Sequence, residues 1–553
     1  MKSLNVWAWL ASSAALAASS AYAEETIAFD WFEYSGRDST FSAPLPPGSF
    51  HNPILAGYYP DPSVVRVGDK FYLVNSTFAH WPGIPIHESS DLVHWKLIGH
   101  ALNDPSKVSY DGLGISRGVF APAISYHEGT FYVVNTLVDA GGNFVVTAKN
   151  PKGPWTDPAW LKNVDGIDPA LFFDVDGKAW LVNNGPPPGK PLYPGHRAIW
   201  IHEFDAAKLA AGPARLLVDG GTDIGKKPVW IEGPHLYRVK NWYYLMCAEG
   251  GTERNHSEVV FRSKSPLGPF ESYKDNPILT QRDLPADRAS PVTNAGHADL
   301  VQMADGSWWS VFLASRPYKD YLFNTGRETF LLPVHWQNDW PVILPHGKEI
   351  PYVLKAPHAK VKVDPAEADA LSGNFTRRDD FDLAEPGPEW LQVHVPKQPW
   401  YELLNGELVI HPLKVNLDET RNPSFYARRQ AHLRFAASTE YAPPRSPGTA
   451  AGLAAYQNEK YWYFLGSRRV GGQLQLFLER HAGEAFTVVK TVTLAVPETL
   501  RLMINGDGAR YSFSYDAGQG WQPLQDDDDG SILSTAVAGG FVGTVLGPYA
   551  RQE

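Results

Sequence analysis

The sequence has almost no cysteine. Cys247 is the only one among 553 residues, which excludes an intramolecular disulfide framework and any cysteine-rich zinc site. Basic residues are also in the minority, with 49 Lys and Arg against 60 Asp and Glu and a formal net charge of −11. This charge balance argues against a protein that binds nucleic acid or a membrane surface through positive charge, so neither is expected as a partner.

Long apolar runs are absent beyond the first residues. Residues 1–23 begin with a single lysine, Lys2, continue through an apolar stretch and end in Ala21-Tyr22-Ala23. This order is typical of a secretory signal peptide, and it predicts an exported protein of a bacterial periplasm or secretion pathway. A membrane anchor is the alternative, and it is disfavoured because the run is short and interrupted by serine.

Aromatic residues and turn formers are plentiful. Aromatics make up 13% of the chain, and there are 48 Gly and 46 Pro, which favours many short strands over a helical bundle. One phrase, a turn residue followed by an aromatic pair in a short apolar run, occurs five times. The stretch of chain between successive copies has the right length for one four-stranded propeller blade with its loops. The copies are GDKFYLVNS from Gly68, GTFYVVNT from Gly129, GKAWLVNN from Gly177, NWYYLMCA from Asn241 and GSWWSVFL from Gly306.

The repeat ends before the last third of the chain. We predict an all-β protein in which a five-bladed β-propeller occupies residues 24–360 and a linker occupies residues 361–375. Residues 376–553 hold short alternating runs such as GELVIHPL from Gly406 and YWYFLG from Tyr461. These runs predict a C-terminal β-sandwich or jelly roll.

Acidic residues recur at matching positions ahead of the aromatic phrases. Asp61, Asp168, Glu232 and His297 stand ten or eleven residues upstream in four blades, and Phe120-Ala121 takes this place in the second. The first strand of a blade lies nearest the central channel, so these side chains are expected to converge there. A single Asp-Pro is more simply a turn or a strand cap, but three acids and a histidine in register favour a site.

Converging carboxylates suit glycoside hydrolysis. One acid must be protonated to help the leaving oxygen depart, and another must be ionised to activate water or attack directly. A third carboxylate raises the pKa of the acid by like-charge repulsion. Phe78, Trp81 and Phe120 are candidates for apolar faces against sugar rings, although each taken alone is more often a core residue.

Six stretches together resemble glycoside hydrolase family 43, the five-bladed propeller group of β-xylosidases, α-L-arabinofuranosidases and arabinanases. The resemblance continues into the second domain, at RNPSFYARRQ from Arg421 and AGLAAYQNEKYWYFLG from Ala451, and it implies the concanavalin-like sandwich of the xylosidase-type members. The six stretches are NPILAGYYPDPSVVRVGDKFYLVNSTF from Asn52, RGVFAPAISYHEGTFYVV from Arg117, DGIDPALFFDVDGK from Asp165, IEGPHLYRVKNWYYL from Ile231, GHADLV from Gly296 and GRETFLLPVHW from Gly326.

The resemblance implies an inverting, single-displacement mechanism. Asp61 would be the general base that activates water, and Glu232 would be the general acid that protonates the leaving group. Asp168 would tune the pKa of Glu232 and hold its orientation. Inversion would require the acid and the base to stand about 6.5–9.5 Å apart.

The resemblance also assigns roles around these carboxylates. Arg327 would hydrogen-bond the sugar or a catalytic carboxylate, and Phe78 would wall the −1 subsite. His297 would ligate a structural calcium ion on the propeller axis, directly or through water, while the chemistry itself would require no cofactor. Phe120 departs from the tryptophan of many relatives, and the insertion at residues 186–196 could form a rim of the pocket or a plain surface loop.

The expected function is removal of terminal β-D-xylose from xylo-oligosaccharides, with α-L-arabinofuranose as a second sugar. An α-L-arabinofuranosidase or an arabinan-cleaving hydrolase with an open groove is the alternative. A fructan hydrolase is disfavoured because its Asn-Asp-Pro-Asn-Gly phrase does not occur. A non-catalytic carbohydrate-binding propeller is a remote alternative, since all three carboxylates are present. The sequence does not indicate an oligomeric state.

Overall fold

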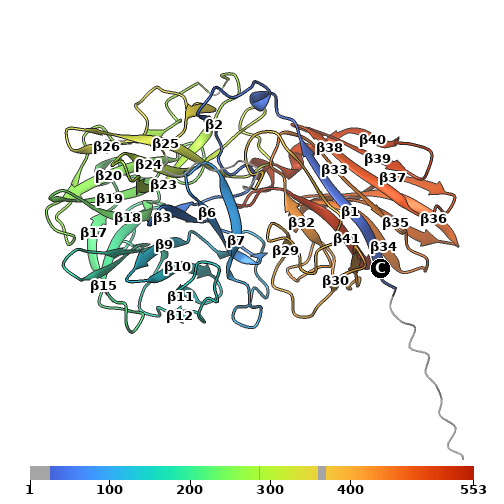
Figure 1. Ribbon diagram of the computed structural model, residues 1–553, viewed down its shortest axis with the longest axis horizontal. Coiled ribbons are helices and arrows are strands. Elements are labelled where there is room, and N and C mark those ends of the chain that lie inside the picture. Colours follow the sequence, from blue (N-terminus) through green and yellow to red (C-terminus); the bar gives the residue numbers. More distant parts are fainter. Residues whose placement is uncertain (1–24, 286, 359–368) are drawn as a thin grey trace, which may run out of the picture.

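The computed structural model describes residues 25–285, 287–358 and 369–553. The predicted signal peptide at residues 1–23 and the linker residues 361–368 lie outside this part of the chain. Two β-rich domains lie side by side (Figure 1). Among the described residues, no helix combines the length and apolar character needed to cross a membrane.

The predicted five-bladed propeller is confirmed. Five antiparallel sheets follow one another along the chain, and β23 of the fifth lies against β3 of the first, which closes the ring. The sheets comprise β3 (Ser63–Val67), β4 (Lys70–Val74), β6 (Gly83–Ser89) and β7 (Trp95–Leu102); β8 (Gly118–Val119), β9 (Ala123–His127), β10 (Thr130–Val138), β11 (Gly142–Ala148) and β12 (Ala159–Trp160); β13 (Ile167–Phe173), β14 (Ala179–Gly185), β15 (Ala198–Asp205), β16 (Ala210–Ala211) and β17 (Arg215–Asp219); β18 (Glu232–Val239), β19 (Trp242–Glu249), β20 (Ser257–Ser263), β21 (Glu271–Ser272) and β22 (Leu279–Thr280); and β23 (Thr293–Gln302), β24 (Trp308–Ser315), β25 (Glu328–Gln337) and β26 (Trp340–Val342).

The repeated aromatic phrase forms the second long strand of each blade, namely β4, β10, β14, β19 and β24. In four blades a glycine with positive φ makes the turn before it, such as Gly68 (φ 63°) and Gly177 (φ 86°). Glycine suits these turns because it adopts positive φ without a steric penalty. The strand before each turn is the first long strand of its blade, and Asp168, Glu232 and His297 lie on three of these strands, β13, β18 and β23.

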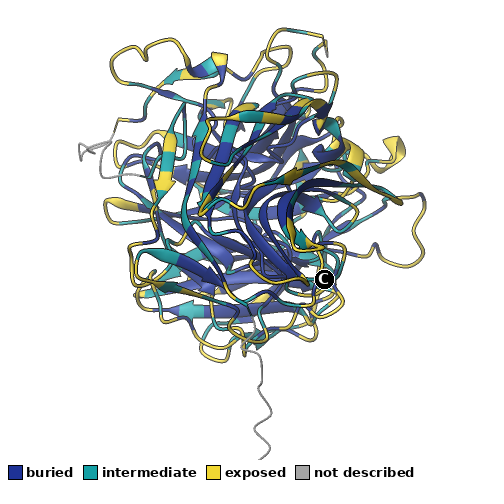
Figure 2. Ribbon diagram, turned by 90° about the vertical axis from the view of Figure 1, so that its right-hand side faces the viewer, coloured by how far each residue is buried: buried dark blue, intermediate teal, exposed yellow. Residues whose placement is uncertain are grey.

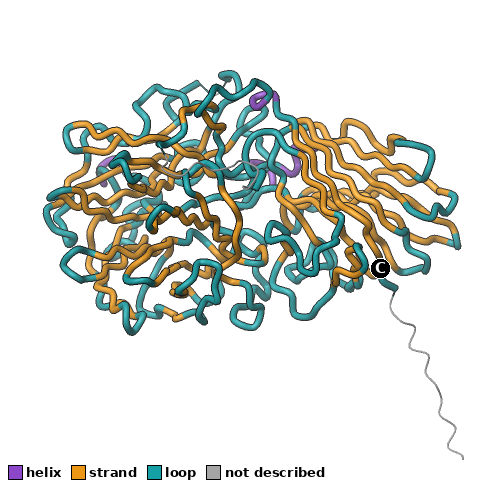
Figure 3. The backbone as a smooth tube through the Cα atoms, viewed as in Figure 1, coloured by secondary structure: helices purple, strands orange, loops and turns teal. Residues whose placement is uncertain are grey.

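The C-terminal domain is the predicted sandwich, built from two large antiparallel sheets. Figure 3 shows that strands dominate both domains and that helices are short. One sheet contains β30 (Tyr401–Leu404), β31 (Glu407–Ile410), β1 (Ile27–Gly36), β33 (Arg434–Tyr441), β38 (Leu500–Asp507), β39 (Arg510–Asp516), β40 (Gln522–Asp529) and β28 (Thr376–Asp379); the other contains β37 (Ala485–Leu494), β36 (Gln473–Ala482), β35 (Tyr461–Val470), β34 (Thr449–Asn458), β41 (Val545–Gln552), β32 (Tyr426–Arg429), β29 (Leu391–Val393) and β5 (His80–Trp81).

The remaining elements are short. Strand β2 (Ser49–His51) pairs with β27 (Val353–Lys355) beside the propeller. The helical segments are 3-10 turns η1 (Ser39–Phe41), η2 (Ile224–Lys226) and η4 (Gly530–Leu533), together with the single-turn helix α1 (Thr535–Ala538).

Strand β1 corrects the predicted domain boundary. The propeller is predicted to begin at residue 24, but β1 pairs with β33, β31 and β28 in the sandwich, where it is the blue strand among orange and red ones (Figure 1). Alternation along residues 27–36 identifies a strand but carries no information about its partner. That partner follows about 400 residues later, so proximity in sequence assigned β1 to the wrong domain.

The two domains share a buried core, and Figure 2 shows that buried strands fill the interior while exposed residues gather on the outer loops. Trp81 of the propeller belongs to a cluster that also includes Leu391 and Tyr456 of the sandwich, and its strand β5 pairs with β29. Trp81 is therefore an interface core residue. Its prediction as a sugar platform is wrong, because the β-pairing turns it toward the sandwich.

Candidate active site

The sequence-predicted site residues meet in one narrow cavity. Its volume is about 60 Å³, and all three carboxylates contribute to its lining. The starts of the first strands of several blades supply these groups, as the repeat spacing predicted. The lining residues are Asp61, Phe78, Phe120, Ala121, Ile167, Asp168, Glu232, Thr252, His297, Arg327 and Phe541.

Irregular backbone aims these side chains into the cavity. Asp61, Phe78, Asp168 and His297 all have positive φ, between 49° and 54°. Residues with a β-carbon pay a steric cost in this region, and such strain concentrates at functional sites. The strand register also shifts beside Asp168, Glu232 and His297, and bulges of this kind re-aim side chains.

Asp61 is held as a carboxylate. Burial alone would raise its pKa, but Arg327, whose Nη1 donates to Oδ1 at 3.0 Å, and His297, whose Nδ1 lies 3.8 Å from the same oxygen, act against burial. Ser76 Oγ donates to the other oxygen at 2.5 Å. Together these groups bring the pKa of Asp61 below its usual value. An ionised carboxylate of this kind can accept a proton from water.

Asp168 and Glu232 have the opposite tendency. Burial, followed by the negative charge of Asp61, raises the pKa of Asp168 to about 7, and the Gly233 N–H donates to its Oδ2 at 3.1 Å. Burial, followed by repulsion from Asp168 and then Asp61, raises the pKa of Glu232 well above its usual value. The cavity therefore holds an ionised carboxylate near a protonated one, which is the pairing that acid–base hydrolysis requires.

Arg327 links the carboxylates to an aromatic wall. Its Nη1 also donates to Thr252 Oγ1 at 2.8 Å, and its guanidinium carbon lies 5.7 Å from the ring centre of Phe78 and 5.6 Å from that of Phe541. The Phe78 ring stacks on Phe541 at 5.6 Å and meets the Phe120 ring edge-on at 5.2 Å. Three phenylalanines thus form an apolar face beside the charged groups.

Phe541 comes from the sandwich and was not predicted. It lies between α1 and β41, and its N–H donates to Ser116 Oγ of the propeller at 2.9 Å. A β-carbon on Gly540 would stand 2.2 Å from Ser116 Oγ, so this approach requires glycine. The GGFVG sequence at residues 539–543 signalled a special backbone conformation but not its docking partner.

A polar chain behind Glu232 was also missed. Arg197 donates through Nε to Asn184 Oδ1 at 3.0 Å, and Asn184 Nδ2 donates to the carbonyl of Ile231 at 2.5 Å. Asp168 and Glu232 both lie within electrostatic reach of Arg197. Asn184 ends the third copy of the repeated phrase, but the repeat gives no sign of its link to Arg197, which lies outside the repeated positions.

His297 lies in the cavity, but its surroundings do not fit a calcium cage of side chains. A calcium ion takes six to eight oxygen ligands. The described residues contain no group of three or more His, Cys, Asp or Glu that could hold a metal ion. Burial lowers the pKa of His297 to about 4, which leaves the imidazole neutral beside Asp61.

The insertion at residues 186–196 does not line the cavity. It packs beside it instead, where the Trp230 N–H donates to the Gly195 carbonyl at 2.8 Å. This loop therefore supports the segment that leads to Glu232.

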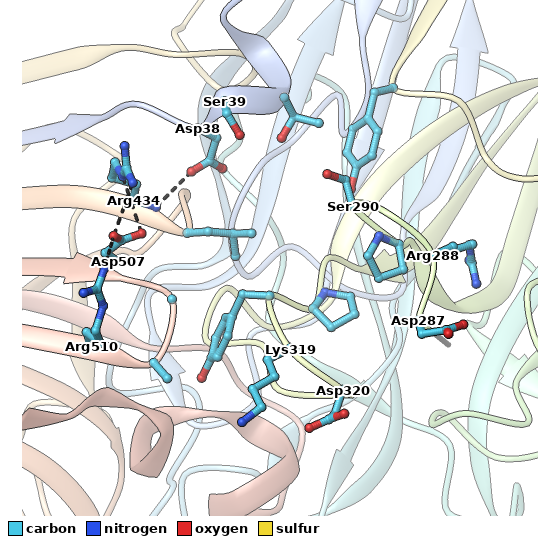
Figure 4. Close-up of a pocket in the computed structure, with 18 residues that line it drawn as sticks. Asp38, Ser39, Asp287, Arg288, Ser290, Lys319, Asp320, Arg434, Asp507 and Arg510 are labelled. Atoms are coloured by element: carbon cyan, nitrogen blue, oxygen red, sulfur yellow. Dashed lines mark hydrogen bonds and ion pairs between the residues drawn. The ribbon is translucent and has the colours of Figure 1, made fainter. Parts of the chain in front are cut away.

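A larger cavity of about 600 Å³ lies between the domains and is drawn in Figure 4. On the sandwich side its charges are paired: Arg434 and Arg510 both bind Asp507, and the backbone N–H of Arg434 donates to Asp38. It shares no lining residue with the carboxylate cavity. The narrow cavity, with its crowded acids, is therefore the candidate active site.

Comparisons with known proteins agree with this geometry. Residues 50–341 match the family model described as glycosyl hydrolases family 43. The chain belongs to glycoside hydrolase family 43. As a family 43 protein it is a glycosidase, and its residues 378–553 match a model described as the beta xylosidase C-terminal concanavalin A-like domain.

Several relatives align over most of the chain. A non-reducing end alpha-L-arabinofuranosidase of Bacteroides ovatus is 36% identical over 91% of this chain and 91% of its own length. A xylosidase/arabinosidase of Butyrivibrio fibrisolvens is 40% identical over 74% of this chain and 78% of its own. A crystal structure described as a GH43_12 retrieved from capybara gut metagenome superposes with a TM-score of 0.89 at 40% identity, covering 95% of this chain and 99% of that one.

Proposed function

We propose that this family 43 protein is an inverting, exo-acting glycosidase that removes terminal pentoses. The sugar is β-D-xylose from xylo-oligosaccharides, with α-L-arabinofuranose as the alternative. The observation that carries the proposal is the convergence of Asp61, Asp168 and Glu232 in one narrow cavity where Arg327 binds Asp61. The opposite pKa shifts of Asp61 and Glu232 agree with it. The printed names of relatives include both xylosidases and arabinofuranosidases, which supports this pair of sugars.

The proposed reaction is a single displacement. Asp61 takes a proton from a water molecule, and the water oxygen attacks the anomeric carbon. Glu232 donates its proton to the glycosidic oxygen as the bond to the leaving sugar breaks. When Asp168 is ionised, its negative charge repels a second negative charge on Glu232 and so keeps Glu232 protonated before the bond breaks.

Closure of the cavity supports the exo mode. Phe541 brings the sandwich against Phe78 and Arg327, so a cavity of about 60 Å³ remains instead of an open groove. Such a space, walled on the sandwich side, favours entry of a terminal ring over passage of a long chain. An arabinan-cleaving enzyme with an open groove is therefore the less favoured function.

Two further proposals accompany this function. Export to the periplasm or the medium follows from the character of residues 1–23, and a structural calcium ion at His297 stays a prediction on which no step depends.

The test is a side-by-side hydrolysis assay. Purified protein is given 4-nitrophenyl β-D-xylopyranoside, 4-nitrophenyl α-L-arabinofuranoside and linear arabinan, with Asp61→Asn as the blank. We expect release of a single pentose from at least one glycoside and no shortening of internal arabinan bonds. Internal cleavage of arabinan, or equal rates for the protein and Asp61→Asn, would overturn the proposal.

A further inference from the structure

Trp230 is an exposed tryptophan next to the proposed acid. It lies two residues before Glu232 and is 40% exposed. Its φ is 52°, in the same left-handed region as Asp61, Phe78, Asp168 and His297. A bulky residue there is strained, and an observed strain of this kind is a reason to look for a function.

Fixed contacts hold the indole ring in place. The guanidinium carbon of Arg197 lies 5.1 Å from the ring centre, and Arg197 is itself bound to Asn184. The edge of the ring lies close to Gly195, where an added β-carbon would stand 3.4 Å from Trp230 Cδ1. The platform is thus held in place before any ligand binds, and preorganisation of this kind reduces the cost of binding.

Other exposed apolar side chains lie on the same segment as Trp230 and on the insertion that contacts it through Gly195. Val229 is 40% exposed and Leu192, in the 186–196 insertion, is 70% exposed. Tyr193 of the same insertion donates to the Gly220 carbonyl, which joins the insertion to the segment leading to Trp230. Two loops therefore build one apolar surface beside the cavity and outside its lining.

The proposed reaction determines which part of the substrate lies beside Trp230. The acid donates its proton to the glycosidic oxygen, and that oxygen departs with the leaving sugar. The leaving ring must therefore stand on the Glu232 side of the cavity, away from Asp61 and its water. Trp230 packs against Arg197, and the charge of Arg197 acts on Glu232. Trp230 therefore lies on that side.

We propose that Trp230, backed by Arg197 and the 186–196 loop, is the platform on which the first sugar ring of the leaving group stacks. The inference rests on the proposed function and deepens it. Aromatic faces bind the apolar faces of rings, and a partly exposed aromatic anchor of this kind supplies a large share of binding energy.

The experiment compares substrates with and without a leaving ring. Trp230→Ala is assayed on a disaccharide or trisaccharide that the wild type hydrolyses and on the corresponding pentosyl fluoride, whose leaving group cannot reach Trp230. We expect the ratio of kcat/KM for the oligosaccharide to kcat/KM for the fluoride to fall about 10- to 30-fold, mainly through KM. Trp230→Phe is expected to restore most of the ratio.

Controls separate a subsite from a structural role. Trp521→Ala removes a comparably exposed tryptophan of the sandwich, 44% exposed, and is expected to leave the ratio unchanged. Trp230→Gly suits the positive φ, so its melting temperature is not expected to fall while the ratio falls as in Trp230→Ala.

Either of two results would overturn the inference: an unchanged ratio, or equal losses on both substrates, which would make Trp230 a support for Glu232. Failure of the proposed function would look different, since the wild type would then hydrolyse neither substrate.

Discussion

At the scale of the residue, the neighbours of each carboxylate determine its protonation. Asp61 and Asp168 are buried and Glu232 is half-buried, and the loss of solvent by itself raises the pKa of each. Only Asp61 receives Arg327 directly, and the positive charge reverses the effect of burial there. Glu232 has two negative neighbours, Asp168 and Asp61, and their repulsion raises its pKa further. One cavity can thus hold a base and an acid at the same pH.

Replacing Glu232 removes the proposed proton donor. Glu232→Gln is expected to lower kcat/KM on natural oligosaccharides by about 10²- to 10⁴-fold, because a sugar is a poor leaving group without protonation. The loss should be much smaller with a nitrophenyl glycoside, whose leaving group needs little help. Steady-state kinetics on both substrates measure the difference, and equal losses on both would contradict the role of Glu232 as the acid.

Replacing Asp168 is expected to move the pH profile. The active form of Glu232 is protonated, and repulsion from Asp168 helps to raise its pKa. Asp168→Asn removes that repulsion, so the pKa of Glu232 falls and the alkaline limb of kcat/KM moves to lower pH.

The acidic limb of the same pH profile reports the ionisation of Asp61, whose pKa Arg327 keeps low. Its position can be compared with that of the alkaline limb. Removing the Asp168 charge can only lower the pKa of Asp61, so the acidic limb is not expected to move to higher pH. An alkaline limb that stays in place or moves to higher pH would show that Asp168 does not act through charge on Glu232.

Sequence repeats located the acids but not their partners. Asp61, Asp168, Glu232 and His297 occupy equivalent places in different blades, so a single-chain pattern was sufficient to group them. Ser76 ends the first copy of the aromatic phrase and donates to Asp61, but the repeat did not indicate this contact. Thr252, which binds Arg327, and Arg197, which lies within electrostatic reach of Asp168 and Glu232, stand outside the repeated positions. Their roles depend on side-chain geometry across blades, which periodicity does not encode.

At the scale of the element, short loops complete the cavity. The segment between α1 and β41 reaches from the sandwich to the propeller and places Phe541 against Phe78 and Phe120. The glycines around it were visible in the sequence, but contact with Ser116 joins positions 425 residues apart. Local turn chemistry predicts that such a loop is tight and says nothing about its target.

Truncating Phe541 tests this wall. Phe541→Ala is expected to raise KM for pentosides with a smaller change in kcat, and to lower kcat/KM about 10-fold, because one apolar face of the terminal ring is lost. Phe486→Ala provides a control, since Phe486 is 53% exposed at a distant place in the sandwich. Unchanged kinetics for Phe541→Ala would mean that the sandwich does not shape the site.

At the scale of the whole molecule, the domains are joined by buried charge as well as by apolar packing. Arg316, at the end of β24, donates to Glu328 Oε2 at 2.6 Å, to Asp38 Oδ2 at 2.7 Å and to the carbonyl of Ala431 at 2.8 Å. Asp38 follows β1, and Ala431 lies in the sandwich. Fold class and the repeat count were predictable, but this junction and the place of β1 depend on contacts between distant segments.

Removing this arginine is expected to destabilise the protein. Arg316→Met leaves Glu328 and Asp38 buried without their cation, and loss of one partner of a buried pair costs about 3–5 kcal/mol. Equilibrium urea unfolding measures the change. Lys240→Met, which breaks the exposed 2.9 Å pair with Asp339, is the control and should cost at most about 1 kcal/mol. Equal effects of the two substitutions would contradict the account of the junction.

The most direct test of the central claim is the anomeric form of the first product, followed by proton NMR during hydrolysis of the preferred 4-nitrophenyl pentoside. A water molecule activated by Asp61 and a leaving group protonated by Glu232 predict inversion, so a β-xyloside should first yield α-xylose and an α-arabinofuranoside should first yield the β-anomer. First release of the anomer that matches the substrate would mean retention through a covalent intermediate, and it would contradict the single displacement assigned to this cavity.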